Sequence, residues 1–404
     1  MKILEINSVC GHGSTGVIAV EIANLLLQHG HECYIAYGQG STSYHNSFKI
    51  GSKLENHFHN LFFSKILGLQ GYGTRSGTLR LIKWIKYVNP DIIHLHNIHG
   101  HYLNFPILFR FLRDADIPVV WSFFDCWPFT GKCSHFTEIK CRKWETGCYN
   151  CPLLKSYPKS YFFDCSNKLY NVKKSLFTSL KSLNIITCSN WLREEVEKSF
   201  FTKYPIHMIY NWIDCEKFKP IITEEVYTKF GINPARKYLV SMSAFWNTDQ
   251  SRYIDALRLS DILPDEYQLV LVGKLVGKPQ QRKNITHIPF VANTVDLSIL
   301  YSNALAYVNF SVEDTFGKVI AEAMLCGTPA IVFDSTACPE VVGDAGFVVP
   351  PHDVTEMLRA VQTIEIKGKD EYGKRGIEYV KNNYDYKKNV GKYLSLYEHI
   401  LRIE

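Results

Sequence analysis

The chain has 404 residues, of which 46% are hydrophobic, and a formal net charge of +6. This length exceeds what one ordinary hydrophobic core holds, so we expect two or three domains in a soluble globular protein. The positive excess is too small to indicate nucleic-acid binding, but it suits anionic substrates or an anionic membrane surface. No run of about eighteen apolar residues occurs, and the N-terminus does not read as a signal peptide. We therefore expect a cytoplasmic protein, and its twelve cysteines favour metal binding or buried thiols over a disulfide framework.

The chain begins with a predicted strand, a glycine-rich turn and a helix. The strand covers residues 3–6, the turn ends at Gly16, and the helix covers residues 17–29, before a second strand at residues 33–37. Such a turn lets the backbone approach a phosphate closely. No acidic residue ends the second strand, where a ribose-binding carboxylate would lie, which counts against a nicotinamide enzyme.

Residues 53–86 are basic and aromatic, with helical periodicity on both sides of Gly71-Tyr72-Gly73. One interpretation is a pair of helices that pack on the sheet. The alternative is a surface that meets a membrane interface, where a lipid-linked acceptor would be presented.

The next predicted strand, at residues 92–97, ends in polar residues, and four histidines lie in or just after it: His94, His96, His99 and His101. Strand alternation places His94 and His96 on one face. Contacts to substrate at the strand end, structural roles in the core and a metal pair all remain open.

A further strand at residues 119–123 leads into Asp125 and Trp127, and then into four cysteines, Cys133, Cys141, Cys148 and Cys151. The two-residue gap between the last two lets both thiolates bind one tetrahedral ion, so the four predict a structural zinc site, with His135 as a substitute ligand. Buried free thiols and an iron–sulfur cluster are the alternatives.

The second half repeats the α/β rhythm after a polar, turn-rich boundary at residues 211–220. Strands are expected at residues 238–243, 269–272, 285–289, 305–310 and 330–333, with helices between them. This alternation predicts a parallel sheet covered on both faces.

Residues 311–329 carry the strongest functional signal. Asp314 and Glu322 flank Phe316, Gly317 and Lys318, which form a turn that opens a helix between two buried strands. Ligands bind at the carboxyl ends of such strands, and a helix N-terminus suits a phosphate. Lys318 in the first turn opposes the helix dipole unless an anion binds there. Two carboxylates beside a phosphate site suggest a phosphorylated, hydroxyl-rich ligand such as a nucleotide sugar.

These motifs together resemble the retaining GT-B glycosyltransferases of family four, and more narrowly the bacterial capsule, O-antigen and colanic-acid-type sugar transferases. The similarity rests on the turn at Gly16, the segment at residues 90–100, the segment at residues 125–133, the cysteine cluster and the stretch at residues 314–329.

The resemblance implies two Rossmann-like domains facing a cleft: an acceptor-side domain at residues 1–210, onto which residues 388–404 cross back, and a donor-binding domain at residues 211–387. It also implies a nucleotide diphosphate sugar donor, a lipid-linked glycan acceptor, no nucleic acid, no catalytic metal, and contact with the inner face of the cytoplasmic membrane. By position, Glu322 holds the ribose, Gly317 and Lys318 hold the diphosphate with Phe316 beside them, Asp314 lies near the hexose, and Gly16 approaches the phosphate. Asp125 joins Asp314 as a catalytic candidate, and the candidate acceptor residues are His96, Asn97 and Trp127.

The chain departs from the family pattern in three places. Asp314 stands where Glu is usual, and Phe124 stands where a His is usual. The third departure is Asn247-Thr248-Asp249-Gln250, which lacks the usual Arg and Lys for the diphosphate. Arg252 or Lys274 are candidates to compensate for these two charges.

The leading hypothesis is therefore retaining transfer of a hexose. The alternative is a non-catalytic partner subunit that keeps the fold and binds nucleotide or sugar without turnover. A nucleotide-sugar epimerase or a phosphorylase of related fold ranks last, because neither a lysine-cofactor motif nor a Ser-Tyr-Lys pattern is present.

Overall fold

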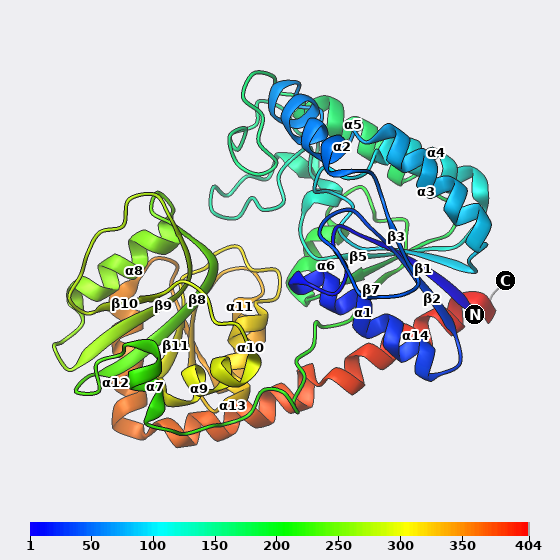
Figure 1. Ribbon diagram of the computed structural model, residues 1–404. Coiled ribbons are helices and arrows are strands. Elements are labelled where there is room, and N and C mark those ends of the chain that lie inside the picture. Colours follow the sequence, from blue (N-terminus) through cyan, green and yellow to red (C-terminus); the bar gives the residue numbers. More distant parts are fainter. Residues whose placement is uncertain (403–404) are drawn as a thin grey trace. The chain divides into compact units, whose positions relative to one another are not determined.

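The computed structural model describes residues 1–402, which form two compact units, each built on its own parallel sheet (Figure 1). Unit 1 contains Met1–Ile209 and the segment that starts at Val390, and unit 2 contains Tyr210–Asn389. The predicted fold class, two Rossmann-like α/β domains, is confirmed.

The sheet of unit 1 has seven strands in the order β3-β2-β1-β4-β5-β6-β7, and all pairs are parallel. Its central strands are almost continuous apolar runs, as expected for a sheet buried on both faces. The strands are β1 (Lys2–Asn7), β2 (Glu32–Tyr37), β3 (Ser47–Lys49), β4 (Ile92–Leu95), β5 (Val119–Phe123), β6 (Leu183–Thr187) and β7 (Ile206–Met208).

Helices cover both faces of this sheet, with α3, α4 and α5 along one face and α1 and the end of α14 along the other (Figure 1). The helices of unit 1 are α1 (Gly13–Gln28), α2 (Lys53–Phe58), the π-helical segment η1 (His59–Ile66), α3 (Arg75–Val88), α4 (Phe105–Ala115), η2 (Trp127–Phe129), η3 (Lys143–Glu145), α5 (Ser166–Phe177), α6 (Asn190–Glu197) and, from Val390 on, α14 (Tyr386–Arg402).

The sheet of unit 2 has six parallel strands in the order β10-β9-β8-β11-β12-β13. The strands are β8 (Lys237–Asn247), β9 (Tyr267–Val276), β10 (Ile285–Ile288), β11 (Ala306–Asn309), β12 (Ala330–Phe333) and β13 (Phe347–Val349). The predicted alternation of strand and helix is confirmed here, and the switch in strand order falls between β8 and β11.

Helices α8 and α12 pack together over one face of this sheet, where Tyr253, Met357 and Val361 join the apolar side chains of the strands in one buried cluster. Helix α9 leads from β10 across the switch point to β11, and α10 and α11 follow β11 and β12 on the other side. The helices of unit 2 are α7 (Glu225–Phe230), α8 (Ser251–Ile262), α9 (Thr294–Asn303), α10 (Lys318–Leu325), α11 (Cys338–Val342), η4 (Gly343–Ala345), α12 (Val354–Lys367) and α13 (Lys369–Tyr384).

Several predicted boundaries differ from the structure. The helix expected at residues 17–29 begins four residues earlier, so Gly16 lies inside α1 rather than in a free turn. The strands expected at residues 238–243 and 269–272 both continue, to Asn247 and Val276. The last two residues of the segment 388–404, expected to cross back onto the first domain, lie outside the described residues.

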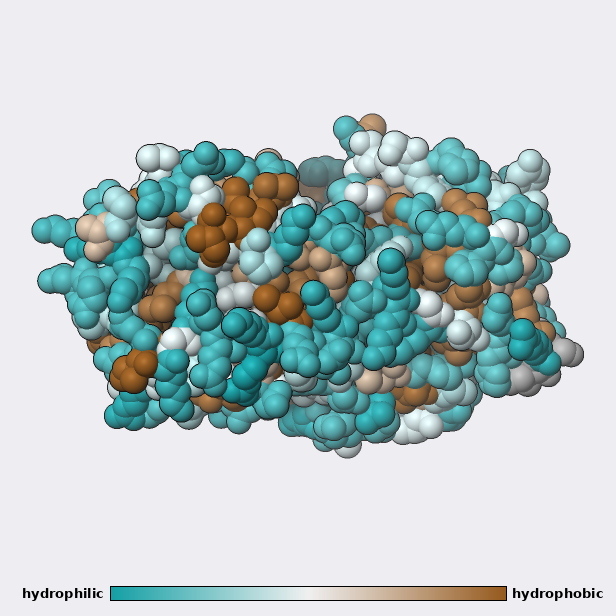
Figure 2. Space-filling model, turned by 90° about the horizontal axis from the view of Figure 1, so that it is seen from below, coloured by the Kyte–Doolittle hydropathy of each residue, from teal (hydrophilic) through white to brown (hydrophobic). Residues whose placement is uncertain are grey.

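The face of the molecule drawn in Figure 2 is mostly hydrophilic, with apolar groups between the polar ones. Within residues 1–402, no helix combines the length and the apolar character needed to cross a bilayer.

Candidate functional site

A β-bulge in unit 2 shapes one side of the candidate site. The register between β8 and β9 shifts between Met242 and Phe245, so the chain bulges at Ser243. Gly273 lies beside the bulge, and a Cβ added there would come within 1.7 Å of the Ser243 carbonyl oxygen. Only glycine fits this close approach, and bulges of this kind re-aim side chains.

Arg252, in the first turn of α8, is fixed by two hydroxyl groups. Its Nη1 donates to Ser243 Oγ at 2.6 Å, and its Nη2 donates to the Oγ of Ser311. Ser243 lies at the bulge and Ser311 lies two residues after β11. Two neighbouring strands therefore hold one guanidinium group near their carboxyl ends, at the switch point where ligands bind in such sheets.

Helix α10 begins at that edge, after a left-handed residue. Gly317 has a φ of +83°, and it provides no side chain to cap the helix. The first N–H groups of α10 are therefore available to an anion, and the helix dipole favours one. Lys318 adds a positive charge in the first turn, where no acidic residue offsets it.

Glu322 lies one turn along α10 from Lys318. Its side chain is partly buried near the Tyr301 hydroxyl, which donates to Met242 Sδ at 3.2 Å. Burial raises the pKa of the Glu322 carboxyl above its ordinary value, and the charge of Lys318 and the nearby Tyr301 hydroxyl offset this only in part. A carboxylate in such a place can accept hydrogen bonds from ligand hydroxyl groups.

Asp314 lies in the loop between β11 and α10, and it accepts a hydrogen bond of 3.0 Å from Asn309 Nδ2. The same loop is held from outside by two further bonds, from Ala337 N–H to the Asp314 carbonyl and from Ser335 Oγ to the Val312 carbonyl. The structure thus brings the predicted Asp314, Gly317, Lys318 and Glu322 together with Arg252 in one unit.

Two other predicted donor residues have different surroundings. Phe316 is 2% exposed and packs against Tyr384 and Tyr210, so its ring anchors the loop in the core. Lys274 lies inside the extended β9, paired with Phe245, and its side chain is exposed. Of the two candidates to compensate for the missing Arg and Lys, Arg252 is the one held beside the loop of Asp314.

In unit 1, Asp125 forms a buried pair with His99. His99 Nε2 lies 2.6 Å from Asp125 Oδ2, and His99 Nδ1 lies 3.1 Å from the Tyr157 hydroxyl. The Trp127 N–H donates to Asp125 Oδ1 at 2.9 Å. Burial acts to raise the pKa of Asp125, but the charge and hydrogen bond of His99 outweigh it, so the pKa lies below its ordinary value.

The predicted acceptor residues are less accessible than expected. His96 and Trp127 are each 1% exposed, so their side chains lie in the core and offer no surface to a sugar. The Trp127 indole N–H donates to Gln70, and its ring lies under the ammonium group of Lys173. Asn97 is partly exposed, and its carbonyl accepts from the Tyr102 hydroxyl.

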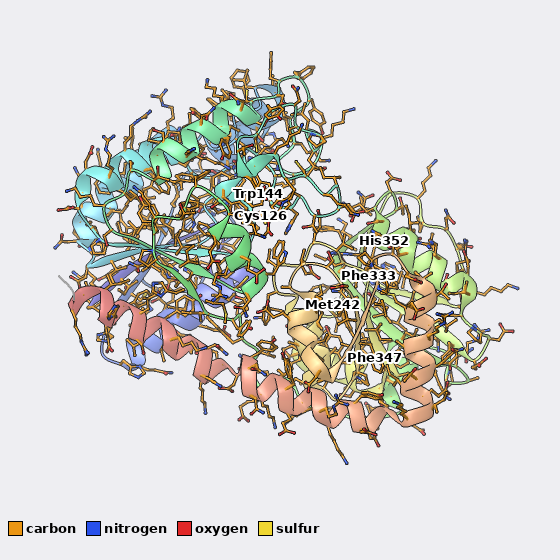
Figure 3. The ribbon with its side chains drawn as sticks, turned by 180° about the vertical axis from the view of Figure 1, so that it is seen from behind. Cys126, Trp144, Met242, Phe333, Phe347 and His352 are labelled. Carbon is orange, nitrogen blue, oxygen red and sulfur yellow. The ribbon has the colours of Figure 1, made fainter. Side chains whose placement is uncertain are left out.

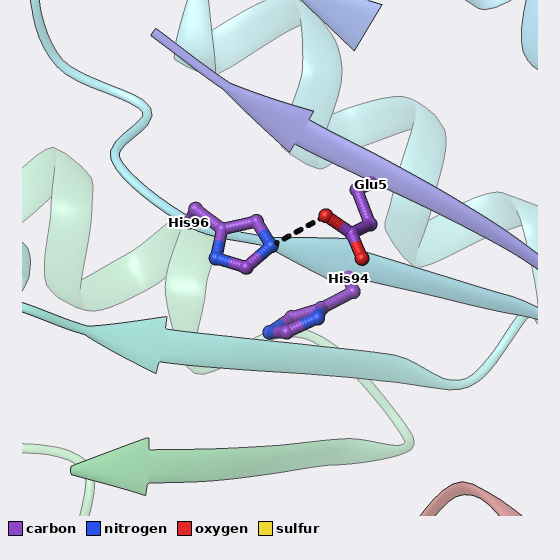
Figure 4. A group of neighbouring side chains, drawn as sticks. All are labelled: Glu5, His94 and His96. Atoms are coloured by element: carbon purple, nitrogen blue, oxygen red, sulfur yellow. Dashed lines mark hydrogen bonds and ion pairs between the residues drawn. The ribbon is translucent and has the colours of Figure 1, made fainter. Parts of the chain in front are cut away.

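His96 instead belongs to a buried polar group with Glu5 and His94, whose ligand atoms lie within 4.8 Å of one another (Figure 4). His96 Nε2 lies 3.1 Å from Glu5 Oε2. His94 uses both nitrogens, at 2.8 Å from Ser122 Oγ and 2.7 Å from the Tyr397 hydroxyl of α14. The alternation that placed both histidines on one face is correct, and their setting is the interior of the sheet.

Gly16 packs against the backbone of Val9, where an added Cβ would meet Val9 carbon and oxygen atoms at 3.2 Å or less. The turn before α1 is closed by a hydrogen bond from Gly11 N–H to the Gly16 carbonyl. This explains the glycine by packing within unit 1. A phosphate contact by Gly16 stays a prediction.

The four cysteines lie in a long loop between η2 and α5. Among the described residues, no three of their sulfur atoms come within 4.8 Å of one another, so the zinc site stays a prediction. The loop nevertheless has an interior: Trp144, labelled in Figure 3, is 1% exposed and contacts the rings of Phe129 and Phe136.

Sequence reasoning missed the residues that hold the predicted ones in place. These are Ser243, Ser311 and Asn309 in unit 2, and His99 and Tyr157 as partners of Asp125 in unit 1. The pairing of His99 with Asp125 had a signal, because β4 and β5 are adjacent parallel strands and both residues closely follow a strand end. No sequence signal pointed to Ser243 and Ser311 as partners of Arg252, because serine is common in loops.

Two Rossmann-like units, with a helix N-terminus and a carboxylate at the switch point of one, are the arrangement of the GT-B fold. Comparison with known proteins agrees. "Glycosyltransferase Family 4" matches residues 15–217, and "Glycosyl transferases group 1" matches residues 236–365. The chain belongs to glycosyltransferase family 4, and it is a glycosyltransferase.

Individual relatives are distant. A proposed colanic acid biosynthesis glycosyl transferase of Escherichia coli K12, WcaC, is 25% identical over 90% of both chains. Among solved structures, sucrose-phosphate synthase from Thermosynechococcus elongatus has a TM-score of 0.70 at 15% identity, covering all of both chains. Anabaena Alr3699/HepE, solved in complex with UDP, has a TM-score of 0.67 at 14% identity over 99% of this chain and 100% of its own. At these identities the structural likeness shows the fold alone.

Proposed function

We propose that this glycosyltransferase moves a hexose, with retention of its anomeric configuration, from a nucleotide diphosphate sugar to a hydroxyl of a lipid-linked glycan in surface polysaccharide synthesis. The observation that carries the donor half of this proposal is the uncapped start of α10, where Gly317 and Lys318 lie beside Glu322 and near the fixed Arg252. The relative WcaC, assigned to colanic acid biosynthesis, supports the polysaccharide context.

The donor diphosphate binds at the start of α10 in this proposal. The backbone N–H groups and Lys318 neutralise the diphosphate as it leaves, which is where electrostatic stabilisation contributes most to such reactions. Arg252 supplies a second charge, in the place of the missing Arg and Lys after Trp246. Glu322 accepts the ribose hydroxyls, and Asp314 lies at the hexose.

On the acceptor side, Asp125 is the proposed catalytic carboxylate of unit 1. His99 holds it in its ionised form, and the Trp127 N–H fixes its orientation. An ionised carboxylate so held can orient the acceptor hydroxyl and receive its proton. His99 also supplies an imidazole close to the position where Phe124 replaces the usual His.

Exposed apolar side chains in unit 1 support the proposal of a lipid-linked acceptor. Phe58, Leu61 and Phe62 are 38% to 54% exposed, and the loop with Phe162 and Phe163 is tied to the same segment by a bond from Tyr161 N–H to the Lys65 carbonyl. Exposed aromatic side chains near lysines are typical of surfaces that bind anionic membranes. The interpretation of residues 53–86 as a membrane-facing surface is thus retained as part of the proposal.

The test is a donor screen followed by a transfer assay. Uridine, guanosine and adenosine diphosphate sugars are screened by thermal shift, since a bound ligand raises the melting temperature by mass action. The stabilising donor is then incubated with a synthetic lipid-diphosphate sugar. We expect a product with retained configuration. Donor binding without transfer, on acceptors of varied structure, would favour the non-catalytic subunit, and binding of no donor would refute the proposal.

A further inference from the structure

The loop between η2 and α5 is long for a segment with so little regular structure. From Thr130 to Cys165 the one helical element is the single turn η3. The small aromatic cluster around Trp144 is one source of order, and five of the chain's cysteines lie in the same segment, four of them from Cys133 to Cys151. Loops of this kind are commonly stabilised by a metal ion or by disulfides.

The four cysteines lie on segments of this loop that contact one another. Lys132, next to Cys133, donates to the Leu153 carbonyl, two residues after Cys151. Lys143, two residues after Cys141, donates to the carbonyls of Tyr149 and Asn150, which lie between Cys148 and Cys151. Cys133 is buried and the other three are partly buried. Their sulfur atoms lie farther apart than in a metal site with zinc–sulfur bonds of about 2.3 Å, so binding of an ion would draw the four side chains together.

A backbone N–H group points at one of the sulfur atoms: Gly131 N–H donates to Cys148 Sγ at 3.1 Å. Such bonds stabilise a thiolate more than a neutral thiol, because hydrogen bonds to ionised groups are about twice as strong.

Two buried lysines give an independent indication. Lys173 is fully buried, and Lys132 is 5% exposed. Their ammonium groups donate to backbone carbonyls, of Trp127 and Thr130 for Lys173 and of Leu153 and Ser156 for Lys132. Among the ion pairs of the described residues, neither lysine has a carboxylate within 4.0 Å.

Instead the two lysines flank the segments that carry the cysteines. Lys132 directly precedes Cys133 and donates to the Leu153 carbonyl, two residues after Cys151. Lys173 donates to the Thr130 carbonyl, next to the Gly131 N–H that donates to Cys148 Sγ. The nearby carboxylates, Asp164 and Asp125, have hydrogen-bond partners of their own. A buried cation without a counter-charge is costly. Four thiolates around a divalent ion carry a net charge of about minus two, which two ammonium groups neutralise.

We propose that Cys133, Cys141, Cys148 and Cys151 bind one structural zinc ion, whose negative tetrathiolate shell is neutralised by the buried Lys132 and Lys173. The ion ties the ends of the loop to η2 and α5 and thereby positions Trp127 and the neighbouring Asp125. This site is separate from the donor site in unit 2, and its existence does not depend on the proposed transfer reaction.

The test is the metal content of the full-length protein, purified under reducing conditions without chelator and measured by inductively coupled plasma mass spectrometry. We expect about one zinc ion per chain, as in other tetrathiolate sites. The Cys148→Ser, Cys151→Ser double variant should lose the zinc, whereas Cys215→Ser, a partly buried cysteine in unit 2, should retain it.

Cobalt substitution gives a second readout that needs no variant, because thiolate-to-cobalt charge-transfer absorption reports sulfur ligands directly. Protein without metal that also gives no such absorption on cobalt addition would overturn the proposal. Zinc that persists in the double cysteine variant but is lost in Glu5→Gln would also overturn it, since the ion would then belong to the group around His94 and His96.

Discussion

At the level of single residues, Glu322 combines a stability cost with a proposed binding role. Its pKa is raised in the folded protein, so folding favours its protonated form. Below the pKa that this carboxyl has in the unfolded chain, the raised pKa costs no stability. The cost in stability develops as the pH rises from that value through the pKa in the folded protein. At neutral pH the ionised side chain is therefore destabilising unless a ligand uses it.

The Glu322→Gln variant tests this directly. Without ligand it should melt at a higher temperature than the natural protein at pH 7, and the difference should vanish at acidic pH. Its donor affinity should fall about ten-fold, because hydrogen bonds to a charged acceptor contribute about 1.5 kcal/mol or more. Thermal melts across pH and calorimetry measure both effects. A lower melting temperature at pH 7 would contradict the assigned pKa direction.

Asp125 gives a second prediction for a single residue. Asp125→Asn removes the proposed proton acceptor while keeping the shape of the site, so the transfer rate should fall about 10²-fold or more. The donor dissociation constant should stay unchanged, because Asp125 is not among the proposed donor contacts. The exposed Asp116→Asn serves as the control. A variant with full transfer rate would remove Asp125 from the mechanism.

At the level of elements, the end of α14 is fastened to the sheet of unit 1 by buried hydroxyl groups. The Tyr397 hydroxyl bonds to His94 Nδ1 at 2.7 Å, and the Tyr393 hydroxyl lies 3.4 Å from Ser122 Oγ. Burial holds the pKa of His94 well below its ordinary value, so this imidazole is neutral at pH 7 and needs a partner at each nitrogen.

Tyr397→Phe should therefore destabilise the protein by about 1–3 kcal/mol, the cost of a buried polar group left without its partner. Denaturant unfolding measures this free energy, and the exposed Tyr87→Phe should leave it unchanged within error. Equal stability of the two variants would show that the hydroxyl of Tyr397 contributes nothing to the attachment of α14.

The elements also differ in how far the sequence predicts them. The stretch from Asp314 to Glu322 is interpretable because two buried strands flank it and because a glycine followed by a lysine at a helix start is typical of an anion-binding turn. The burial of His96 and Trp127 was not predictable, because a polar or aromatic residue after a strand looks the same whether it turns inward or outward. The bulge at Ser243 and the bonds of Arg252 depend on the pairing of β8 with β9, which local sequence does not encode.

At the level of the whole molecule, the exposed aromatic surface of unit 1 predicts reversible membrane binding. The protein should sediment with anionic lipid vesicles, and less so at high salt, because lysine attraction to the surface is screened. The double variant Phe58→Asp, Phe162→Asp, at positions 54% and 71% exposed, should stay in the supernatant. The matched control is Phe290→Asp, 78% exposed in unit 2. Equal sedimentation of all three proteins would argue against this surface.

At this scale the central proposal is that the start of α10 binds the donor diphosphate. Lys318 then carries part of the positive charge that the segment Asn247-Thr248-Asp249-Gln250 does not supply. The most direct measurement is the dissociation constant of the preferred nucleoside diphosphate, by calorimetry, for the natural protein, Lys318→Ala and the exposed Lys374→Ala of α13. Lys318→Ala should bind about ten-fold more weakly, a loss of about 1.4 kcal/mol, while Lys374→Ala binds as before. An unchanged dissociation constant in Lys318→Ala would contradict the assignment of the diphosphate to this helix end.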